Sequence, residues 1–117
     1  EMSTAVQYKL PIKIFILNNE YMGMVRQWQE LLHEKNYSES YTAALPDFVK
    51  LAEAHRATGI RVSKREDVET AVRKAQSTPG VVVIDFEVEK EDSVYPMVAT
   101  GADLDDMIRR PKPEIEW

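Results

Sequence analysis

The chain has 117 residues, of which 44% are hydrophobic, and this length and composition predict a single compact domain with its own core. Its formal net charge is −5 and its basic residues are scattered among acids, so neither nucleic acid nor an anionic membrane is an expected partner. It contains no cysteine, which excludes disulfides, thiolate metal sites and thiol nucleophiles. No apolar run reaches the roughly 18 residues that a membrane span requires, so no membrane partner is expected.

The chain opens with a predicted helix and a predicted strand. Residues 1–10 have the composition of a helix body that ends at Pro11. Because nothing precedes this helix body, we expect the chain to be a fragment of a longer protein. Residues 12–17 are nearly all apolar and rich in β-branched side chains, which is typical of a parallel strand covered on both faces.

The next element changes the hydrophobic period. From Met22 onward, apolar residues recur at helical spacing and predict a helix of about three turns. The face expected to be buried carries Val25, Trp28, Leu31 and Leu32. The face expected to meet water carries Arg26, Gln27, Gln29 and Glu30. The polar segment 34–42 has no period and predicts a long surface loop.

The second half of the chain continues to alternate helices with strands. The predicted elements are a helix over 46–56 with Pro46 in its first turn, a break at Gly59, a strand over 60–62, a helix over 64–77 with a capping box formed by Ser63 and Glu66, and a strand over 81–88. The tail is expected to be mostly irregular, apart from a short helix over 103–109.

This alternation predicts an α/β fold of three layers, in which a mostly parallel sheet has helices on both faces. Three strands are few for such a sheet, so we expect further residues or a partner chain to complete it. Ligands of open parallel sheets bind at the carboxyl ends of the strands. Asn18 and Asn19 lie where the strand over 12–17 ends, and they are therefore candidate site residues.

The asparagine pair has two interpretations. Amide oxygens are suitable ligands for Mg²⁺, which also requires a carboxylate and phosphate oxygens, and Glu20 is the only acid close by. The N–H groups at the start of the next helix favour an anion, and Gly23 permits a close backbone approach. These features favour a site for a metal and a diphosphate. Alternatively, Asn18 and Asn19 simply cap the helix and turn the chain, as asparagine often does.

A resemblance to a known family bears on this choice. The stretch LNNEYMGMVRQWQEL (17–31) resembles the end of the thiamine-diphosphate motif in the catalytic large subunit of acetolactate synthase, or acetohydroxyacid synthase. SYTAALPDFVKLAEAHRATGIRVS (40–63) is similar to the family's loop-and-helix segment, and VYPMVATGADLDDMI (94–108) to its C-terminal stretch. Residues 1–117 are thus identified as the C-terminal portion of a thiamine-diphosphate pyrophosphate-binding domain.

The resemblance implies a set of cofactor-binding residues. Asn19 would be the side-chain ligand of Mg²⁺, and the main-chain carbonyl of Tyr21 would complete the protein's share of that metal site. Met22, Gly23 and Met24 would lie against the diphosphate and the cofactor. The family's Gly-Asp-Gly aspartate and the glutamate that activates the cofactor match nothing in this sequence, so we expect no catalytic residue within it.

The resemblance also implies a substrate channel. Met24, Val25 and Trp28 would line it, and Thr100 would lie near it. Trp28 matches the family tryptophan that favours the larger of two acceptor substrates. From helical periodicity alone, Trp28 would instead be a core residue.

The implied reaction is decarboxylation of pyruvate and condensation with a second 2-keto acid, in branched-chain amino acid biosynthesis. With pyruvate the product is 2-acetolactate, and with 2-ketobutyrate it is 2-aceto-2-hydroxybutyrate. The implied cofactors are thiamine diphosphate, Mg²⁺ and FAD, with the FAD site outside this sequence. The implied assembly is a homodimer or tetramer, with a regulatory small subunit as a candidate partner. The implied location is the bacterial cytoplasm or a eukaryotic organelle.

Two alternatives stay open at this point. One is another thiamine-diphosphate enzyme of the same superfamily, such as a decarboxylase, an oxidase or a glyoxylate carboligase. The other is a folded interaction module without catalytic activity. As a fragment, the chain itself is expected to be inactive in either enzymatic case.

Overall fold

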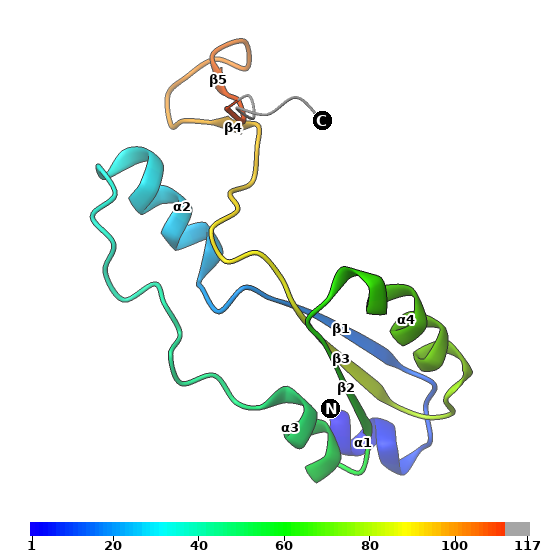
Figure 1. Ribbon diagram of the computed structural model, residues 1–117. Coiled ribbons are helices and arrows are strands. Elements are labelled where there is room, and N and C mark those ends of the chain that lie inside the picture. The colour runs from blue at the N-terminus through cyan, green and yellow to red at the C-terminus, as the bar shows by residue number, and fades with distance from the viewer. Residues whose placement is uncertain (112–117) are drawn as a thin grey trace.

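The computed structural model describes residues 1–111 and has an α/β arrangement (Figure 1). Its elements in chain order are α1 (Met2–Gln7), β1 (Lys13–Asn18), α2 (Gly23–Leu32), α3 (Phe48–Ala54), β2 (Thr58–Val62), the 3₁₀ turn η1 (Arg65–Asp67), α4 (Val68–Ser77), β3 (Val82–Glu87), β4 (Met97–Val98) and β5 (Met107–Ile108). The predicted unit extends to residue 117, and residues 112–117 lie outside the described part. No helix in residues 1–111 is long and apolar enough to cross a membrane.

The parallel sheet confirms the predicted fold class. Its strand order is β1–β3–β2, and Val82 of the central strand pairs with Lys13 of β1 and Thr58 of β2. Helix α4 covers one face, and α3 lies on the opposite face (Figure 1). The buried cluster between α4 and the sheet contains Val62, Ala71, Ala75, Val82, Ile84 and Phe86. The apolar run of β3 is thus buried on both faces, as the sequence predicts.

Strand β1 is less covered than the sequence predicts. Phe15 is 47% exposed and Leu17 is 74% exposed. The reason is that α4 packs over β2 and β3, whereas β1 lies at the edge of the sheet (Figure 1). The rings of Phe15 and Phe86 pack in a T-shaped pair, with their centroids 5.8 Å apart and their planes at 84°. The expectation of full burial is therefore wrong for β1 in this chain.

Helix α3 begins two residues later than the predicted start at Pro46. Pro46 lies outside the helix, and Asp47 is the N-cap. The Asp47 carboxylate accepts hydrogen bonds from the backbone N–H groups of Val49 and Lys50, at 3.0 and 3.1 Å. An acidic N-cap satisfies the first free donors of a helix, which proline cannot do.

Two further predictions, both for the segment between α3 and α4, are wrong. Gly59 lies within β2, where a Cβ atom would be 2.8 Å from the Val49 carbonyl oxygen, so glycine lets α3 pack closely on the strand. The capping box of Ser63 and Glu66 does not form, because the Ser63 hydroxyl donates to Glu87 at 2.6 Å. The chain instead makes the turn η1 before α4 starts.

The helix predicted over 103–109 is also wrong. Within this stretch β5 pairs with β4 in a two-stranded antiparallel sheet, in which Met97 faces Ile108. The connection turns at Gly101, whose φ of 84° lies in the left-handed region that favours glycine. A turn and a short strand therefore replace the expected helix.

The molecule is elongated rather than a single compact unit. Its radius of gyration is 18.2 Å, whereas about 13 Å is expected for a compact chain of this length. One end is the sheet body, which consists of α1, β1–β3, α3, η1 and α4. The other end is the α2 region, which consists of residues 19–42 and 89–111 (Figure 1). The prediction of one compact domain is thus corrected by the structure.

Candidate functional site

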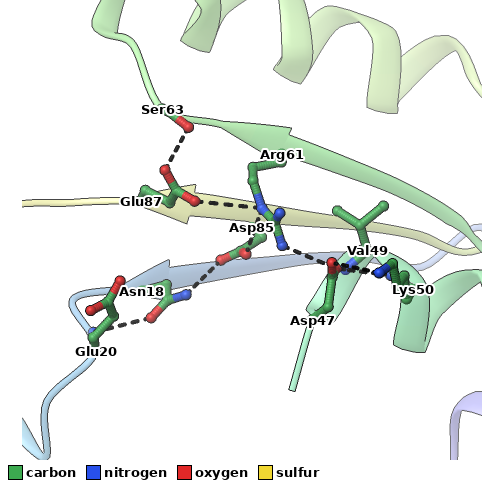
Figure 2. A network of polar contacts seen from close by, with 9 residues as sticks. All are labelled: Asn18, Glu20, Asp47, Val49, Lys50, Arg61, Ser63, Asp85 and Glu87. Carbon is green, nitrogen blue, oxygen red and sulfur yellow. Dashed lines mark hydrogen bonds and ion pairs between the residues drawn. The ribbon is translucent and has the colours of Figure 1, made fainter. Parts of the chain in front are cut away.

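The turn between β1 and α2 lies at the carboxyl edge of the parallel sheet (Figure 2). The Asn18 Oδ1 atom accepts a hydrogen bond from the Glu20 N–H at 3.1 Å, and Asn19 Oδ1 accepts one from the Tyr21 N–H at 3.2 Å. Glu20 has a φ of 60°, a left-handed conformation that costs energy for a residue with a side chain. Two successive asparagine turns therefore stabilise an otherwise unfavourable backbone.

The N-terminus of α2 adjoins this turn. Met22 is the N-cap residue, and no side chain in residues 1–111 caps the helix by a hydrogen bond. The hydrogen bond from the Arg26 N–H to the Met22 carbonyl, at 3.0 Å, starts the helix, and the Met22 N–H donates to the Ser40 carbonyl at 2.8 Å. The N–H groups of Gly23, Met24 and Val25, in the first turn, therefore remain donors for an anion. A Cβ atom at Gly23 would be 3.1 Å from Asn19 Nδ2, so glycine permits this close approach.

Glu20 is already engaged by other side chains. Its carboxylate accepts hydrogen bonds from Lys90 Nζ at 2.6 Å and from the Tyr41 hydroxyl at 3.0 Å. These two hydrogen bonds, with that of Lys90 the stronger, lower the pKa of Glu20, and the same contacts raise the pKa values of Lys90 and Tyr41. Glu20 is therefore held as a carboxylate in a structural pair, not presented to a metal.

The turn nevertheless fits a metal ion that also binds a diphosphate. The Asn19 amide and the Tyr21 carbonyl are neutral oxygen ligands of the kind that Mg²⁺ accepts, and the uncapped start of α2 suits the diphosphate. Residues 1–111 contain no group of three His, Cys, Asp or Glu residues arranged to hold a metal. The remaining negative ligands of such an ion would have to come from the diphosphate and from outside these residues.

A polar network supports the turn from the sheet (Figure 2). Asp85 of β3 is 2% exposed, and its carboxylate accepts hydrogen bonds from Asn18 Nδ2 at 3.1 Å and from Arg61 Nε at 3.4 Å. Arg61 also donates to Asp47 at 3.0 Å. Burial acts to lower the pKa of Arg61, but Asp47 and Asp85 outweigh it, so the pKa is raised. Asp85 and Arg61 are not among the site residues predicted from the sequence, although an acid inside an apolar strand indicates a position with a special role.

Helix α2 faces the opposite way from the prediction. Arg26 and Gln27 are only 6% and 4% exposed, whereas Val25 and Trp28 are each 46% exposed. The physical reason is that Gln27 makes two hydrogen bonds of 2.9 Å with the backbone of Val94, one as donor and one as acceptor. The polar face of α2 thus packs on the chain, and the interpretation of Trp28 as a core residue is wrong.

Arg26 anchors the same buried face. Its guanidinium lies over the rings of Tyr21 and Tyr37, at 5.3 and 4.9 Å from their centroids. It also donates to the Glu30 carboxylate at 2.8 Å. An arginine can be buried in this way because aromatic faces and a carboxylate together compensate its charge.

The exposed apolar face of α2 forms one side of a groove of about 830 Å³. The lining residues are Met24, Val25, Trp28, Gln29, Leu32, His33, Glu34 and Asn36. The structure therefore brings together three of the predicted channel residues, Met24, Val25 and Trp28. Thr100 is exposed beside Gly101 and is not among the lining residues of this groove.

Solved structures with the same fold define the class of this protein. The chain aligns with a thiamine diphosphate-dependent 4-hydroxybenzoylformate decarboxylase from Rhodococcus jostii RHA1 with a TM-score of 0.69 and 30% identity, over 78% of this chain and 17% of that one. It aligns with a benzoylformate decarboxylase from Polynucleobacter necessarius with a TM-score of 0.70 and 28% identity, over 80% of this chain and 18% of that one. The fold is that of a thiamine-diphosphate-binding domain.

The family of the chain follows from its sequence. The model of the thiamine pyrophosphate enzyme C-terminal TPP-binding domain matches residues 1–86, and the chain belongs to this family.

Curated relatives extend the match to nearly the whole chain. They include the mitochondrial acetolactate synthase catalytic subunit of Saccharomyces cerevisiae, 47% identical over 116 residues, or 99% of this chain and 17% of the relative. The acetolactate synthase isozyme 3 large subunit of Escherichia coli strain K12 is 41% identical over 92% of this chain and 19% of the relative. The resemblance to acetolactate synthase large subunits is thus confirmed. The chain spans about a fifth of the length of these relatives.

Proposed function

We propose that residues 1–117 are the C-terminal portion of the thiamine-diphosphate-binding domain of an acetolactate synthase catalytic subunit. The single observation that supports this most strongly is the turn at Asn18 and Asn19, held against the uncapped start of α2 and followed by the apolar groove. The identity of 47% to a relative named as an acetolactate synthase catalytic subunit points to the same activity.

In this proposal each residue of the turn has a defined role. The Asn19 amide oxygen and the Tyr21 carbonyl would bind Mg²⁺. Met22 would lie beside the diphosphate, and the N–H groups of Gly23 and Met24 at the start of α2 would donate to it. Thiamine diphosphate, when bound, supplies the electron sink that permits decarboxylation of pyruvate. The protein's own contribution is to hold the metal ligands in a fixed turn and to leave the helix donors available.

The groove on α2 is the proposed channel for the substrates. Met24, Val25 and Trp28 present apolar surface to pyruvate and 2-ketobutyrate, and Thr100 would lie near the channel once the remaining protein is in place. A volume of about 830 Å³ is within the range of small-molecule sites. The products would be 2-acetolactate and 2-aceto-2-hydroxybutyrate, precursors in branched-chain amino acid biosynthesis.

The proposal requires further protein around this chain. The exposed apolar side chains of Phe15 and Leu17 on the edge strand indicate that further protein covers it. Residues 1–111 contain no group of three His, Cys, Asp or Glu that could hold the metal. FAD would bind outside this chain, and the working assembly would be a homodimer or tetramer with a candidate regulatory small subunit. Relatives include bacterial and mitochondrial proteins, so either the bacterial cytoplasm or an organelle is the proposed location.

The test is an assay of the intact catalytic subunit with pyruvate, thiamine diphosphate and Mg²⁺. We expect acetolactate from the intact subunit and none from residues 1–117 alone. Asn19→Ala should weaken Mg²⁺ binding by more than the about tenfold that is typical of an outer-shell substitution. Gln76→Ala, which removes an exposed amide from α4, is the matched control and should leave Mg²⁺ binding unchanged.

A second assay tests the groove. With pyruvate and 2-ketobutyrate together, Trp28→Leu should lower the ratio of 2-aceto-2-hydroxybutyrate to 2-acetolactate roughly tenfold. The two acceptor substrates differ by one methylene group, and the loss of its contacts in an apolar pocket changes the discrimination between them by about this factor. An unchanged product ratio would remove Trp28 from the proposed channel.

A decarboxylase is the alternative that a specific observation favours, because the two solved structures described above are decarboxylases that act on benzoylformate or its hydroxylated form. Release of benzaldehyde from benzoylformate, without acetolactate from pyruvate, would support that alternative. An intact subunit that self-associates but binds neither thiamine diphosphate nor Mg²⁺ would instead indicate an interaction module without catalytic activity.

A further inference from the structure

We propose that Asp85 is a positioning residue for the metal-binding turn and that it acts through Asn18. This inference rests on the function proposed above and deepens it. Asp85 is 2% exposed and interrupts the apolar side chains of the central strand β3. A buried carboxylate is costly unless hydrogen bonds compensate it, and its two partners here are Asn18 and Arg61. Neither the metal ligands nor the groove includes Asp85, so its burial calls for another role.

The Asn18 amide transmits this contact to the turn. Its Nδ2 atom donates to Asp85 at 3.1 Å, and its Oδ1 atom accepts from the Glu20 N–H at 3.1 Å. A carboxylate can only accept, so Asp85 fixes which end of the amide faces the sheet and which end faces the turn. The left-handed Glu20, with a φ of 60°, is therefore held by an amide that Asp85 keeps in one orientation.

The opposite side of the turn is held independently. The Glu20 carbonyl accepts hydrogen bonds from the Thr42 N–H at 2.8 Å and the Thr42 hydroxyl at 2.6 Å, and the Met22 N–H donates to the Ser40 carbonyl at 2.8 Å. The turn thus lies between the loop segment 40–42 and the buried Asp85. Loss of the contact on the sheet side would let Glu20 rotate and would change the separation of the Asn19 amide from the Tyr21 carbonyl.

Arg61 fixes the remaining oxygen of Asp85. Its Nε atom lies 3.4 Å from Asp85 Oδ2, while Asn18 binds Oδ1 (Figure 2). The three side chains form one donor and acceptor series, from Arg61 through Asp85 to Asn18 and the Glu20 N–H. An exchange of the amide and the carboxylate between positions 18 and 85 would preserve this series, because each donor would still face an acceptor.

The exchange provides the test, carried out on the intact catalytic subunit. Asn18→Asp places a carboxylate at position 18 against the Asp85 carboxylate, so the hydrogen bond between the two side chains is lost. The Mg²⁺ affinity should then fall about tenfold, the usual effect of losing an outer-shell partner. Mg²⁺ affinity is measured by calorimetric titration at saturating thiamine diphosphate. The KM for pyruvate at saturating Mg²⁺ should stay unchanged. The double variant Asn18→Asp with Asp85→Asn should recover most of the lost affinity.

The matched control is Glu87→Gln. Glu87 lies two residues further along β3 and contacts Ser63 and Arg61. The hydrogen bonds of the Asn18 side chain within residues 1–111 are with Asp85 and Glu20, so neutralisation of Glu87 should not alter Mg²⁺ affinity. Affinity unchanged in Asn18→Asp, or not recovered in the double variant, would overturn the role of Asp85 while the proposed function stands. A wild-type subunit that binds no Mg²⁺ with thiamine diphosphate would overturn the proposed function and this inference together.

Discussion

Helices α2 and α4 are both ten residues long and amphipathic, yet they bury opposite faces. Helix α4 buries Ala71 and Ala75 against the sheet, as its apolar spacing predicts. Helix α2 buries Arg26 and Gln27 and leaves Trp28 half exposed. Amphipathic spacing therefore identifies both helices but gives the packed face of only one.

The difference follows from what each helix contacts. Helix α4 lies over β2 and β3, whose apolar side chains complete a core. Helix α2 lies against the extended segment 91–97, whose backbone offers hydrogen bonds to Gln27 and Arg26. The apolar face of α2 then remains available for a ligand or for further protein, which is the usual meaning of a large exposed apolar surface. The sheet body is stabilised by apolar burial and the α2 region by polar contacts.

The largest predicted effect tests the sheet body. Ala75→Asp places a charge under α4, where Ala75 is 0% exposed, and should lower the free energy of unfolding by about 3 to 5 kcal/mol, the cost of an uncompensated buried charge. Urea unfolding of the purified chain, followed by circular dichroism, measures this change.

Trp28→Asp is the control on α2. The same charge introduced on the exposed face of α2 should cost less than about 1 kcal/mol, as for most substitutions of half-exposed residues. Equal losses in the two variants would mean that α2 buries its apolar face in solution, and the contrast between the helices would fail.

The next effect compares two arginine–glutamate pairs with the same spacing. Arg26→Ala removes a buried guanidinium from Tyr21 and Tyr37 and leaves Glu30 with the Ser93 hydroxyl but without its ion-pair partner, which should cost about 2 kcal/mol of local stability. The protection of the Met22 amide against hydrogen exchange should then fall, since that amide joins the turn to the loop 34–42.

The matched variant is Arg73→Ala on α4. Arg73 and Glu69 are each 75% exposed although their atoms are 2.6 Å apart. Exposed pairs of this kind contribute about 0.5 kcal/mol or less. If Arg26→Ala and Arg73→Ala lowered the stability by comparable amounts, the burial of Arg26 would make no contribution to stability beyond that of an exposed ion pair.

Much of the fold is predictable from the sequence because it depends on apolar periodicity. The strands at 12–17 and 81–88, their parallel arrangement and the helices of the sheet body follow from runs and spacings that lead to a buried core. The errors occur where a side chain finds a distant partner. Ser63 donates to Glu87 on another strand rather than capping α4, and Gly59 lies inside β2 because Val49 of α3 packs against it.

The candidate site is only partly predictable for the same reason. The asparagine turn and Gly23 can be found from local sequence, because asparagine turns and helix starts are short-range features. Asp85 and Arg61 lie 67 and 43 positions after Asn18 in the chain, and only the parallel pairing of β1, β3 and β2 brings them together. The assignments of Asn19 and Tyr21 to a metal, and of Thr100 to the channel, stay predictions.

The smallest predicted effect is a difference in acid sensitivity between the two regions. The pKa of Glu20 is below its ordinary value of 4.5, first because of the hydrogen bond from Lys90, and the pKa of Asp92 is lowered by a hydrogen bond from Arg110. A carboxylate with a lowered folded-state pKa adds stability above its unfolded pKa and loses that contribution as the pH falls through the folded value. The pKa of Asp47 at the start of α3 is also lowered, first by the hydrogen bond from the Lys50 N–H. Acid should therefore loosen the α2 region, where both pairs lie, and the start of α3 before the buried cluster under α4.

Two backbone amides can report this difference. The Thr42 N–H donates to the Glu20 carbonyl, and the Val82 N–H donates to Ile12 within the sheet body. As the pH is lowered below 4.5, exchange at Thr42, corrected for its intrinsic rate, should rise before exchange at Val82. Glu20→Gln should reduce the gap between the two amides without abolishing it, because Asp92 still titrates. Simultaneous loss of protection at both amides would mean that the α2 region and the sheet body unfold as one cooperative unit.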